Sequence, residues 1–439
     1  MTIALIGCFA LLAFAHVAAG LRSSRTYEFP FFAGCVMLGW VVPEMLSEWN
    51  AQQFIPERAF QVYLLMACLC SAAIALPALL RRRSPLRSRP EPAAANRYDL
   101  GTLRVTTVVL FVIGMVFFVK LRTIPWEQLK GGWSGAPVMY FFFSRVLRYA
   151  FAMALFLWLD KRDRLMAFIA LCCAATFLES IVFYGRRADS LRFVLTILLA
   201  LYFVKSYRLP RPVMMAGVVV GALMVSAVAL YRPHVRGQHD IDWGAVSEID
   251  LQENMVNVIN GGSGAEIRKA THIVGAIQRR GEFNLGSTYW DAMINEFVPR
   301  QLVGQRAKQS FMLTSVTPEQ MAYEEYGYIG IPGATPTGFS DAYASFWFFG
   351  CLVFSVVTWA MHWLFQKARS GNLQYQVLYT VILVDALLAI THNTNFALAR
   401  AVHALIFVLP CFVLAHAVWS RRAHAYHLYQ RALRARVGA

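Results

Sequence analysis

The chain has 439 residues, of which 58% are hydrophobic, 14% aromatic and only 15% charged. Soluble domains carry about 25% charged residues, so this composition excludes an ordinary soluble protein and indicates a membrane protein. The formal net charge of +16 comes from basic residues scattered over separate segments. Since they form no basic domain, we expect no nucleic-acid partner.

Apolar runs of about 17 to 22 residues recur, each long enough to cross roughly 30 Å of hydrocarbon. We predict eleven spans, at 2–20, 29–46, 60–80, 104–121, 138–159, 165–184, 190–206, 213–230, 344–366, 374–391 and 399–419. The first lacks both a preceding arginine and a convincing cleavage site, so we expect a retained span and not a signal peptide. The predicted fold is an all-α polytopic membrane protein.

The positions of lysine and arginine predict the orientation. Twenty-two basic residues fall on one side of the spans and eight in the short loops opposite. The positive-inside rule then places the N-terminus outside and the C-terminus in the cytoplasm, which agrees with an odd number of spans. Anionic membrane lipids are expected to attract the basic side.

One connection is much longer than the others. We divide the chain into helices 1–8 (1–230), a long outer loop (231–343), helices 9–11 (344–420) and a basic cytoplasmic tail (421–439). Within the loop, 246–280 and 289–298 have helical patterns, so we expect short helices forming a lid on the membrane surface. No repeat relates the two halves, which weakens a secondary-transporter interpretation.

Neither a cofactor nor a metal is predicted. All eight cysteines fall inside predicted spans, without a Cys-x-x-Cys pair. Asp240 and Asp242 resemble the acid pairs that hold a divalent cation, but such pairs are common by chance.

Arginines recur at or near the outer ends of the spans and in the long loop. They are Arg145, Arg148, Arg186, Arg187, Arg192, Arg300, Arg306 and Arg400. A guanidinium in or beside hydrocarbon is costly and usually has a partner or a function. Its planar fork of donors matches phosphate or carboxylate oxygens. The pattern therefore favours an anionic headgroup with its tail in the bilayer, such as a lipid pyrophosphate.

Structural explanations stand beside this one. Glu179 is placed to neutralise Arg145 or Arg148, and either Arg186 or Arg187 could simply reach the interface. A transferase also needs a group that takes or orients a proton, for which the candidates are His272, Glu296, Glu325, Asp341 and His392. His392 could instead be a hydrogen-bonded helix-end residue, and Asp341 could cap the ninth span.

Three segments resemble bacterial oligosaccharide repeat-unit polymerases, the Wzy-type O-antigen polymerases. The segment 179–205, with Gly185-Arg186-Arg187, resembles that family's Gly-Ser-Arg-Gly segment. The segment 296–300 (Glu-Phe-Val-Pro-Arg), followed by Lys308, resembles the family's Ile-Pro-Arg segment, which is also followed by a lysine. The segment 335–350, which begins Thr-Pro-Thr-Gly and ends Phe-Gly, resembles its Thr-Pro-x-Gly stretch. Two departures are a second arginine, Arg187, in place of a small residue, and Gln309 in place of a proline.

The resemblance implies a GT-C-like glycosyltransferase of the bacterial inner membrane. Such enzymes polymerise undecaprenyl-pyrophosphate-linked oligosaccharides at the periplasmic face, and a polysaccharide chain-length regulator is a further partner that the resemblance allows. The residues assigned to catalysis are Arg186, Arg187, Arg192, Arg300, His392 and Asp341. Those assigned to substrate binding are Arg145, Arg148, Arg306, Lys308, Arg400, Glu296 and Tyr343. Arg300→Ala is expected to abolish polymer while lipid-linked single units accumulate.

Two rival functions remain open. An O-antigen ligase uses a similar donor and architecture, and resembles this chain in its large periplasmic loop and late outer-side histidine. A non-catalytic transporter of the lipid-linked glycan would need charged residues along a path to the cytoplasm. Apart from Asp385 and the two arginines of the fifth span, the predicted spans are nearly free of charge.

Overall fold

The computed structural model describes residues 1–23, 25–51, 56–79, 97–124, 135–221, 244, 265–331 and 334–437, with the backbone alone for Leu302 and 427–437. Within these ranges the chain is helical and has no strand.

The first half of the chain forms the helices α1 (Thr2–Arg22), α2 (Phe29–Val36), η1 (Met37–Val41, a π-helix), α3 (Val42–Asn50), α4 (Glu57–Leu79), α5 (Leu100–Arg122), α7 (Ala136–Ser144), α8 (Val146–Lys161), α9 (Arg164–Tyr184) and α10 (Arg187–Lys205). The second half forms α14 (Ala265–Arg280), α15 (Ser287–Phe297), α16 (Arg300–Val303), α17 (Gln305–Ser310), α18 (Pro318–Tyr326), α19 (Gly338–Phe346), η3 (Trp347–Gly350, a 3₁₀-helix), α20 (Cys351–Arg369), α21 (Leu373–Thr391) and α22 (Thr394–Val437).

Nine helical segments of the described chain are long and apolar enough to cross a membrane. They correspond to nine of the eleven predicted spans, which establishes an all-α polytopic membrane protein. The predicted span at 190–206 corresponds to α10, which is not among these nine. Its nineteen residues include Arg187, Asp189 and Arg192. The last, at 213–230, begins in a shorter apolar helix, Arg211–Gly221, and its remainder lies outside the described residues. The GT-C-like arrangement stays a prediction.

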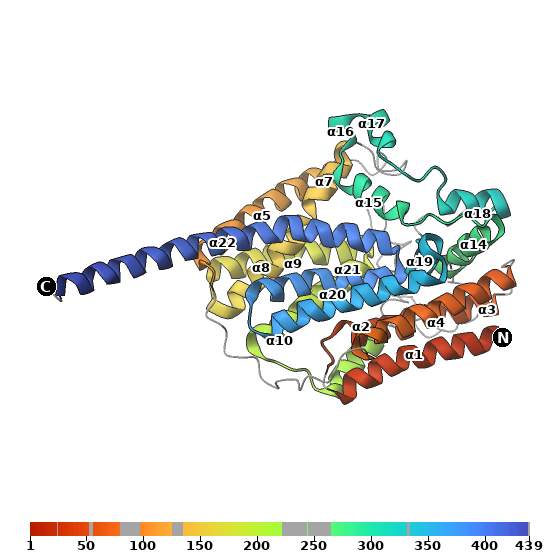
Figure 1. Ribbon diagram of the computed structural model, residues 1–439, viewed down its shortest axis with the longest axis horizontal. Helices are drawn as coiled ribbons and strands as arrows, with labels where there is room; N and C mark the ends of the chain where they lie inside the picture. Colours follow the sequence, from red (N-terminus) through yellow and green to blue (C-terminus); the bar gives the residue numbers. More distant parts are fainter. Residues whose placement is uncertain are drawn as a thin grey trace.

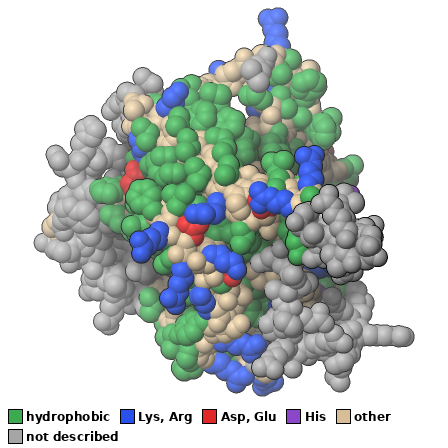
Figure 2. All heavy atoms as spheres, turned by 90° about the vertical axis from the view of Figure 1, so that its left-hand side faces the viewer, with side chains coloured by type: hydrophobic (Ala, Val, Ile, Leu, Met, Phe, Trp, Pro, Cys, Tyr) green, Lys and Arg blue, Asp and Glu red, His purple; other side chains and the backbone are tan. Residues whose placement is uncertain are grey.

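The long helices lie side by side, and the two termini are at opposite ends of the bundle (Figure 1). We call the end with the N-terminus and α14 to α18 the loop end, and the end from which α22 projects the tail end. Lysine and arginine side chains are spread over the tail end, with few acidic ones among them (Figure 2). The placement of this end in the cytoplasm stays a prediction from the positions of lysine and arginine in the sequence.

Two glycines of the 335–350 segment permit close backbone contacts at the loop end. A Cβ on Gly338 would lie 1.7 Å from the carbonyl oxygen of Ala389, and one on Gly350 would lie 2.0 Å from that of Ala342. Any side chain would therefore push α19 away from the end of α21 or from the η3 turn. These contacts hold α19 beside the junction between α21 and α22, where His392 lies.

The short helices of the long loop pack onto the loop end. The apolar face of α14, which includes Ile267, Ile273 and Ile277, is buried and contacts α4, α3, α18 and α19. Helix α15 contacts α22. The predicted helix at 246–280 is therefore seen as α14, with 246–264 outside the described residues, and that at 289–298 as α15.

Candidate functional site

A chain of ion pairs links four helices inside the bundle. The Arg148 guanidinium on α8 lies 3.1 Å from Asp189 on α10. Arg192, one turn further along α10, contacts both Asp189 at 3.1 Å and Asp385 of α21 at 2.6 Å. Arg400 of α22 lies 3.7 Å from the same Asp385. The predicted arginines of the fifth, seventh and eleventh spans thus meet at one place.

Arg145 extends this cluster to the long loop. It occupies the junction of α7 and α8, is 8% exposed, and forms an ion pair with Glu296 of α15. Glu296 is therefore a partner of Arg145, not a free base. Glu179, which we expected to neutralise Arg145 or Arg148, instead pairs with Arg122 of α5 at 2.7 Å. That expectation was wrong.

The cluster contains more positive than negative groups. Four largely buried arginines (Arg145, Arg148, Arg192 and Arg400) meet three carboxylates (Asp189, Asp385 and Glu296). The buried Nε atoms of Arg145 and Arg400 have no hydrogen-bond partner among the described residues. Uncompensated buried charge is unfavourable, so a bound anion would stabilise this arrangement.

A cavity of about 50 Å³ lies next to this cluster, between α5, α7, α8, α9 and α10. Arg122, Arg145, Arg148 and Arg186 contribute guanidinium groups to its wall. Apolar side chains, including Phe118, Phe141 and Phe177, line the rest. Its wall therefore combines anion-binding forks with hydrocarbon.

Arg186 and Arg187 lie in different surroundings. Arg186 faces the cavity, with its guanidinium 5.8 Å from the Phe141 ring. Arg187 lies 4.4 Å from the Trp40 ring and interacts electrostatically with Glu44 and Glu266. Arg186 thus lies on the side of the cavity, and Arg187 on the side of α3 and α14.

His392 follows α21 at the loop end, and its Nδ1 lies 2.9 Å from the Thr391 hydroxyl. Burial, together with the positive charges of Arg400, Arg192 and Arg187, lowers its pKa to about 4. The imidazole is therefore neutral at pH 7 and able to accept a proton. A bound anion that offsets the arginine charges would raise this pKa and strengthen the base.

Asp341 has a structural role at the start of α22. Its Oδ2 accepts hydrogen bonds from the backbone N–H of Thr394 and Asn395 and from the Thr394 hydroxyl, at 2.8, 3.2 and 2.5 Å. We expected Asp341 as a base or as the cap of its own helix. It caps α22 and not its own helix, because α19 passes beside that N-terminus, and its role as a base stays a prediction.

The remaining candidates lie apart from the ion-pair chain. Tyr343 is 2% exposed and packs against Phe283 and Phe348. His272 lies 2.8 Å from the Arg268 carbonyl and stacks on Tyr328, and Glu325 pairs with Arg280 at 2.9 Å. Asp240 and Asp242 lie outside the described residues. No group of three possible metal ligands occurs in the part of the chain that was searched, the described residues.

Arg300, Arg306 and Lys308 lie on the short helices α16 and α17. Arg300 and Arg306 are exposed, and Arg300 lies 3.5 Å from the Gln305 side chain. The Lys308 ammonium donates to the Asn295 carbonyl at 3.1 Å, and burial, with Arg300 nearby, lowers its pKa. They form a positively charged surface on the loop helices.

Sequence reasoning missed Asp189 and did not predict that Asp385 pairs with the arginines. Asp189 and Asp385 are 4% exposed and bind the arginines, and Glu44 and Glu48 of α3 are also buried. The statement that the spans are nearly free of charge was therefore wrong for the second span. A signal was available, because Glu44 lies within a predicted span and Asp189 lies three residues before Arg192.

Comparison with known proteins gave no match to a family model, to a curated protein or to a solved structure.

Proposed function

We propose that this protein is a glycosyltransferase that polymerises oligosaccharide repeat units carried on undecaprenyl pyrophosphate, at the periplasmic face of the bacterial inner membrane. The observation that carries the proposal is the excess of buried guanidinium groups among membrane helices at the loop end. The three segments that resemble Wzy-type polymerases support it, since 179–205 and 296–300 contribute to that cluster or its rim.

A lipid pyrophosphate matches the chemistry of this arginine-lined wall because it combines a multiply charged headgroup with an apolar tail, and the 50 Å³ cavity would have to open to admit it. Arg145, Arg148 and Arg186 would bind the phosphate oxygens. The aromatic side chains of α5 and α7 would contact the first part of the polyprenyl chain. Arg300 and Lys308, on the loop helices above Glu296, would contact the glycan.

The proposed reaction forms one bond and breaks one. A hydroxyl oxygen of the acceptor unit attacks the anomeric carbon of the growing chain, and the anomeric C–O bond to undecaprenyl pyrophosphate breaks. The hydroxyl proton passes to His392 or to solvent. The leaving pyrophosphate gains negative charge, which fixed guanidinium groups in a poorly hydrated site stabilise more in the transition state than in the ground state.

An O-antigen ligase is the second candidate. The position of His392 beside Arg400 and Arg192 favours it as much as a polymerase, since a ligase uses the same donor. It differs in the acceptor, which would be lipid A core. A transporter is supported less, because the buried ion pairs described above hold the helices together near the loop end.

A deletion strain distinguishes these functions. Its lipopolysaccharide is run on a silver-stained gel beside an extract of its lipid carriers. A ladder that collapses to core plus one repeat unit is the result expected for a polymerase. Bare core with long polymer left on undecaprenyl pyrophosphate would make the protein a ligase, and bare core with single units on the cytoplasmic face would make it a transporter.

A further inference from the structure

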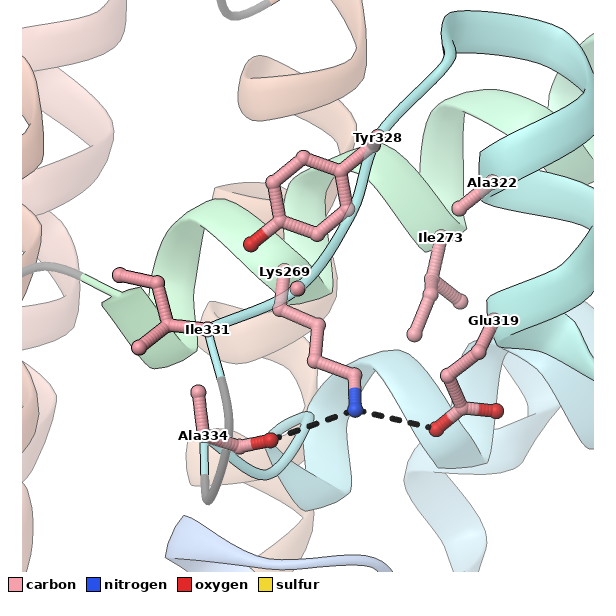
Figure 3. Close-up of a pocket in the computed structure, with 8 residues that line it drawn as sticks. Lys269, Ile273, Glu319, Ala322, Tyr328, Ile331 and Ala334 are labelled. Carbon is pink, nitrogen blue, oxygen red and sulfur yellow. Dashed lines mark hydrogen bonds and ion pairs between the residues drawn. The ribbon is translucent and has the colours of Figure 1, made fainter.

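A second, larger cavity lies at the loop end, away from the arginine-lined one. It occupies about 270 Å³ between α14, α18 and the segment that follows α18. Figure 3 shows Tyr328 at the top, Ile331 on one side and Ala322 and Ile273 on the other, with the Lys269 side chain running down to Ala334 and Glu319. The reaction proposed above does not use this cavity.

Its wall has the mixed chemistry of a carbohydrate site. The Lys269 ammonium is held 3.2 Å from the Ala334 carbonyl and 3.3 Å from Glu319, which presents a donor and an acceptor side by side (Figure 3). Tyr328 contributes a flat ring, fixed by stacking on His272 at 4.2 Å. Its hydroxyl is buried without a hydrogen-bond partner in the described structure. A buried hydroxyl of this kind is unfavourable unless a ligand or water satisfies it.

The size of the cavity restricts the occupant. Sites for drug-sized ligands occupy about 300–1,000 Å³, so 270 Å³ suits a single sugar ring. A sugar has apolar C–H faces that stack on aromatic rings and hydroxyls that pair with Lys, Glu and Tyr. The lining offers a partner for both kinds of surface.

Two connections link the cavity to residues near the candidate site. On α14, Glu266 lies one turn before Lys269 and interacts with Arg187 and Glu44. On the other side, Ala334 precedes Thr335, whose hydroxyl donates to the Thr391 carbonyl at 3.4 Å, next to His392. The cavity thus lies between two segments that both continue into the candidate site.

We propose that this cavity binds one sugar ring of the incoming acceptor repeat unit. The proposal rests on the proposed function, because it assigns the acceptor to a site separate from the donor pyrophosphate. Tyr328 stacks on the ring and hydrogen-bonds a hydroxyl, and Lys269 and Glu319 bind further hydroxyls. The acceptor would then extend along α14 toward Arg187 and His392.

Gly330 provides a way to fill the cavity. A Cβ there would lie 3.7 Å from both Lys269 and Tyr328, in ordinary contact and on a backbone that other residues adopt. Gly330→Leu therefore projects into the cavity without backbone strain. Ile329→Leu is the matched control, because Ile329 is 79% exposed and does not line the cavity.

The probe is a set of oligosaccharide fragments from the host's surface polysaccharide, obtained by partial acid hydrolysis. Their binding to the purified full-length protein in detergent is measured by calorimetry and by saturation-transfer NMR. We expect Gly330→Leu and Tyr328→Phe each to weaken binding about tenfold or more, and Ile329→Leu to leave it unchanged. Thermal unfolding of each variant confirms that it is folded.

The outcomes separate this proposal from the proposed function. The sugar site is overturned if Gly330→Leu and Tyr328→Phe leave fragment binding intact, or if the wild-type protein binds no fragment. Either result holds even where the deletion strain shows a collapsed ladder. Binding lost in both variants supports the sugar site even where the deletion strain keeps its ladder, and in that case only the polymerase function fails.

Discussion

The arginines of the helices and those of the loop look alike in the sequence but differ in their surroundings. Arg148 and Arg192 are held by buried carboxylates between membrane helices, whereas Arg300 and Arg306 are exposed on short helices. Removing a buried partner leaves an uncompensated charge, while removing an exposed one leaves solvated groups. Substitution of a buried arginine such as Arg192 should therefore lower both stability and activity. Substitution of an exposed loop arginine such as Arg300 should lower activity alone.

Arg192→Ala should have the largest effect on stability. It removes the 2.6 Å contact to Asp385 and one of the two arginine contacts to Asp189 in a buried site, which should lower the free energy of unfolding by about 3–5 kcal/mol. Thermal unfolding in detergent measures the change. Arg164→Ala, which removes an exposed arginine at the tail end, is the control, and equal melting temperatures for the two variants would contradict the assigned ion pairs.

Acidification should destabilise the protein in part through His392. Its pKa is about 4 in the folded protein and about 6.5 in an unfolded chain, so the unfolded state takes up the proton first. Stability should then fall as the pH drops from about 6.5 to 4, by up to about 3 kcal/mol from this group.

His392→Gln removes one of the histidines that take up a proton on unfolding in that interval. The loss of stability between pH 6.5 and 4 should therefore be smaller in the variant than in the wild type, as measured by unfolding at a series of pH values. Identical pH profiles would show that His392 is not buried beside the arginines.

Substitution of Asp341 tests capping against catalysis. Asp341→Ala should cost about 1–2 kcal/mol, because the buried N–H groups of Thr394 and Asn395 lose their acceptor. Asp341→Asn retains an amide oxygen that accepts these bonds and should keep polymer formation near the wild-type level on a gel. Loss of polymer in a stable Asp341→Asn protein would restore a catalytic role.

Arg300→Ala should have the smallest effect on stability, within about 0.5 kcal/mol, because the side chain is exposed. Its effect on polymer should be large, with single units accumulating on the lipid carrier. Unfolding and the lipid-carrier extract are measured on the same preparation. Normal chain length in this variant would remove Arg300 from the site.

The membrane helices were largely predictable because apolar runs of sufficient length are a strong local signal. The arginines of the site were also predictable, since a charge beside hydrocarbon is conspicuous. The pairing was not, because Arg148 and Asp189, or Arg192 and Asp385, are 41 and 193 residues apart. The hydrogen bonds that Asp341 accepts from the start of α22 were not predictable either. They depend on how closely Gly338 allows α19 to approach α21.

Reconstitution tests the central claim most directly. Purified protein in lipid nanodiscs is given undecaprenyl-pyrophosphate-linked repeat units extracted from the deletion strain, and the products are separated by size. The account predicts chains of two or more units together with released undecaprenyl pyrophosphate, and no elongation by a folded Arg300→Ala protein. Wild-type protein that is folded but leaves single units unchanged, or transfers them only when lipid A core is added, would contradict it.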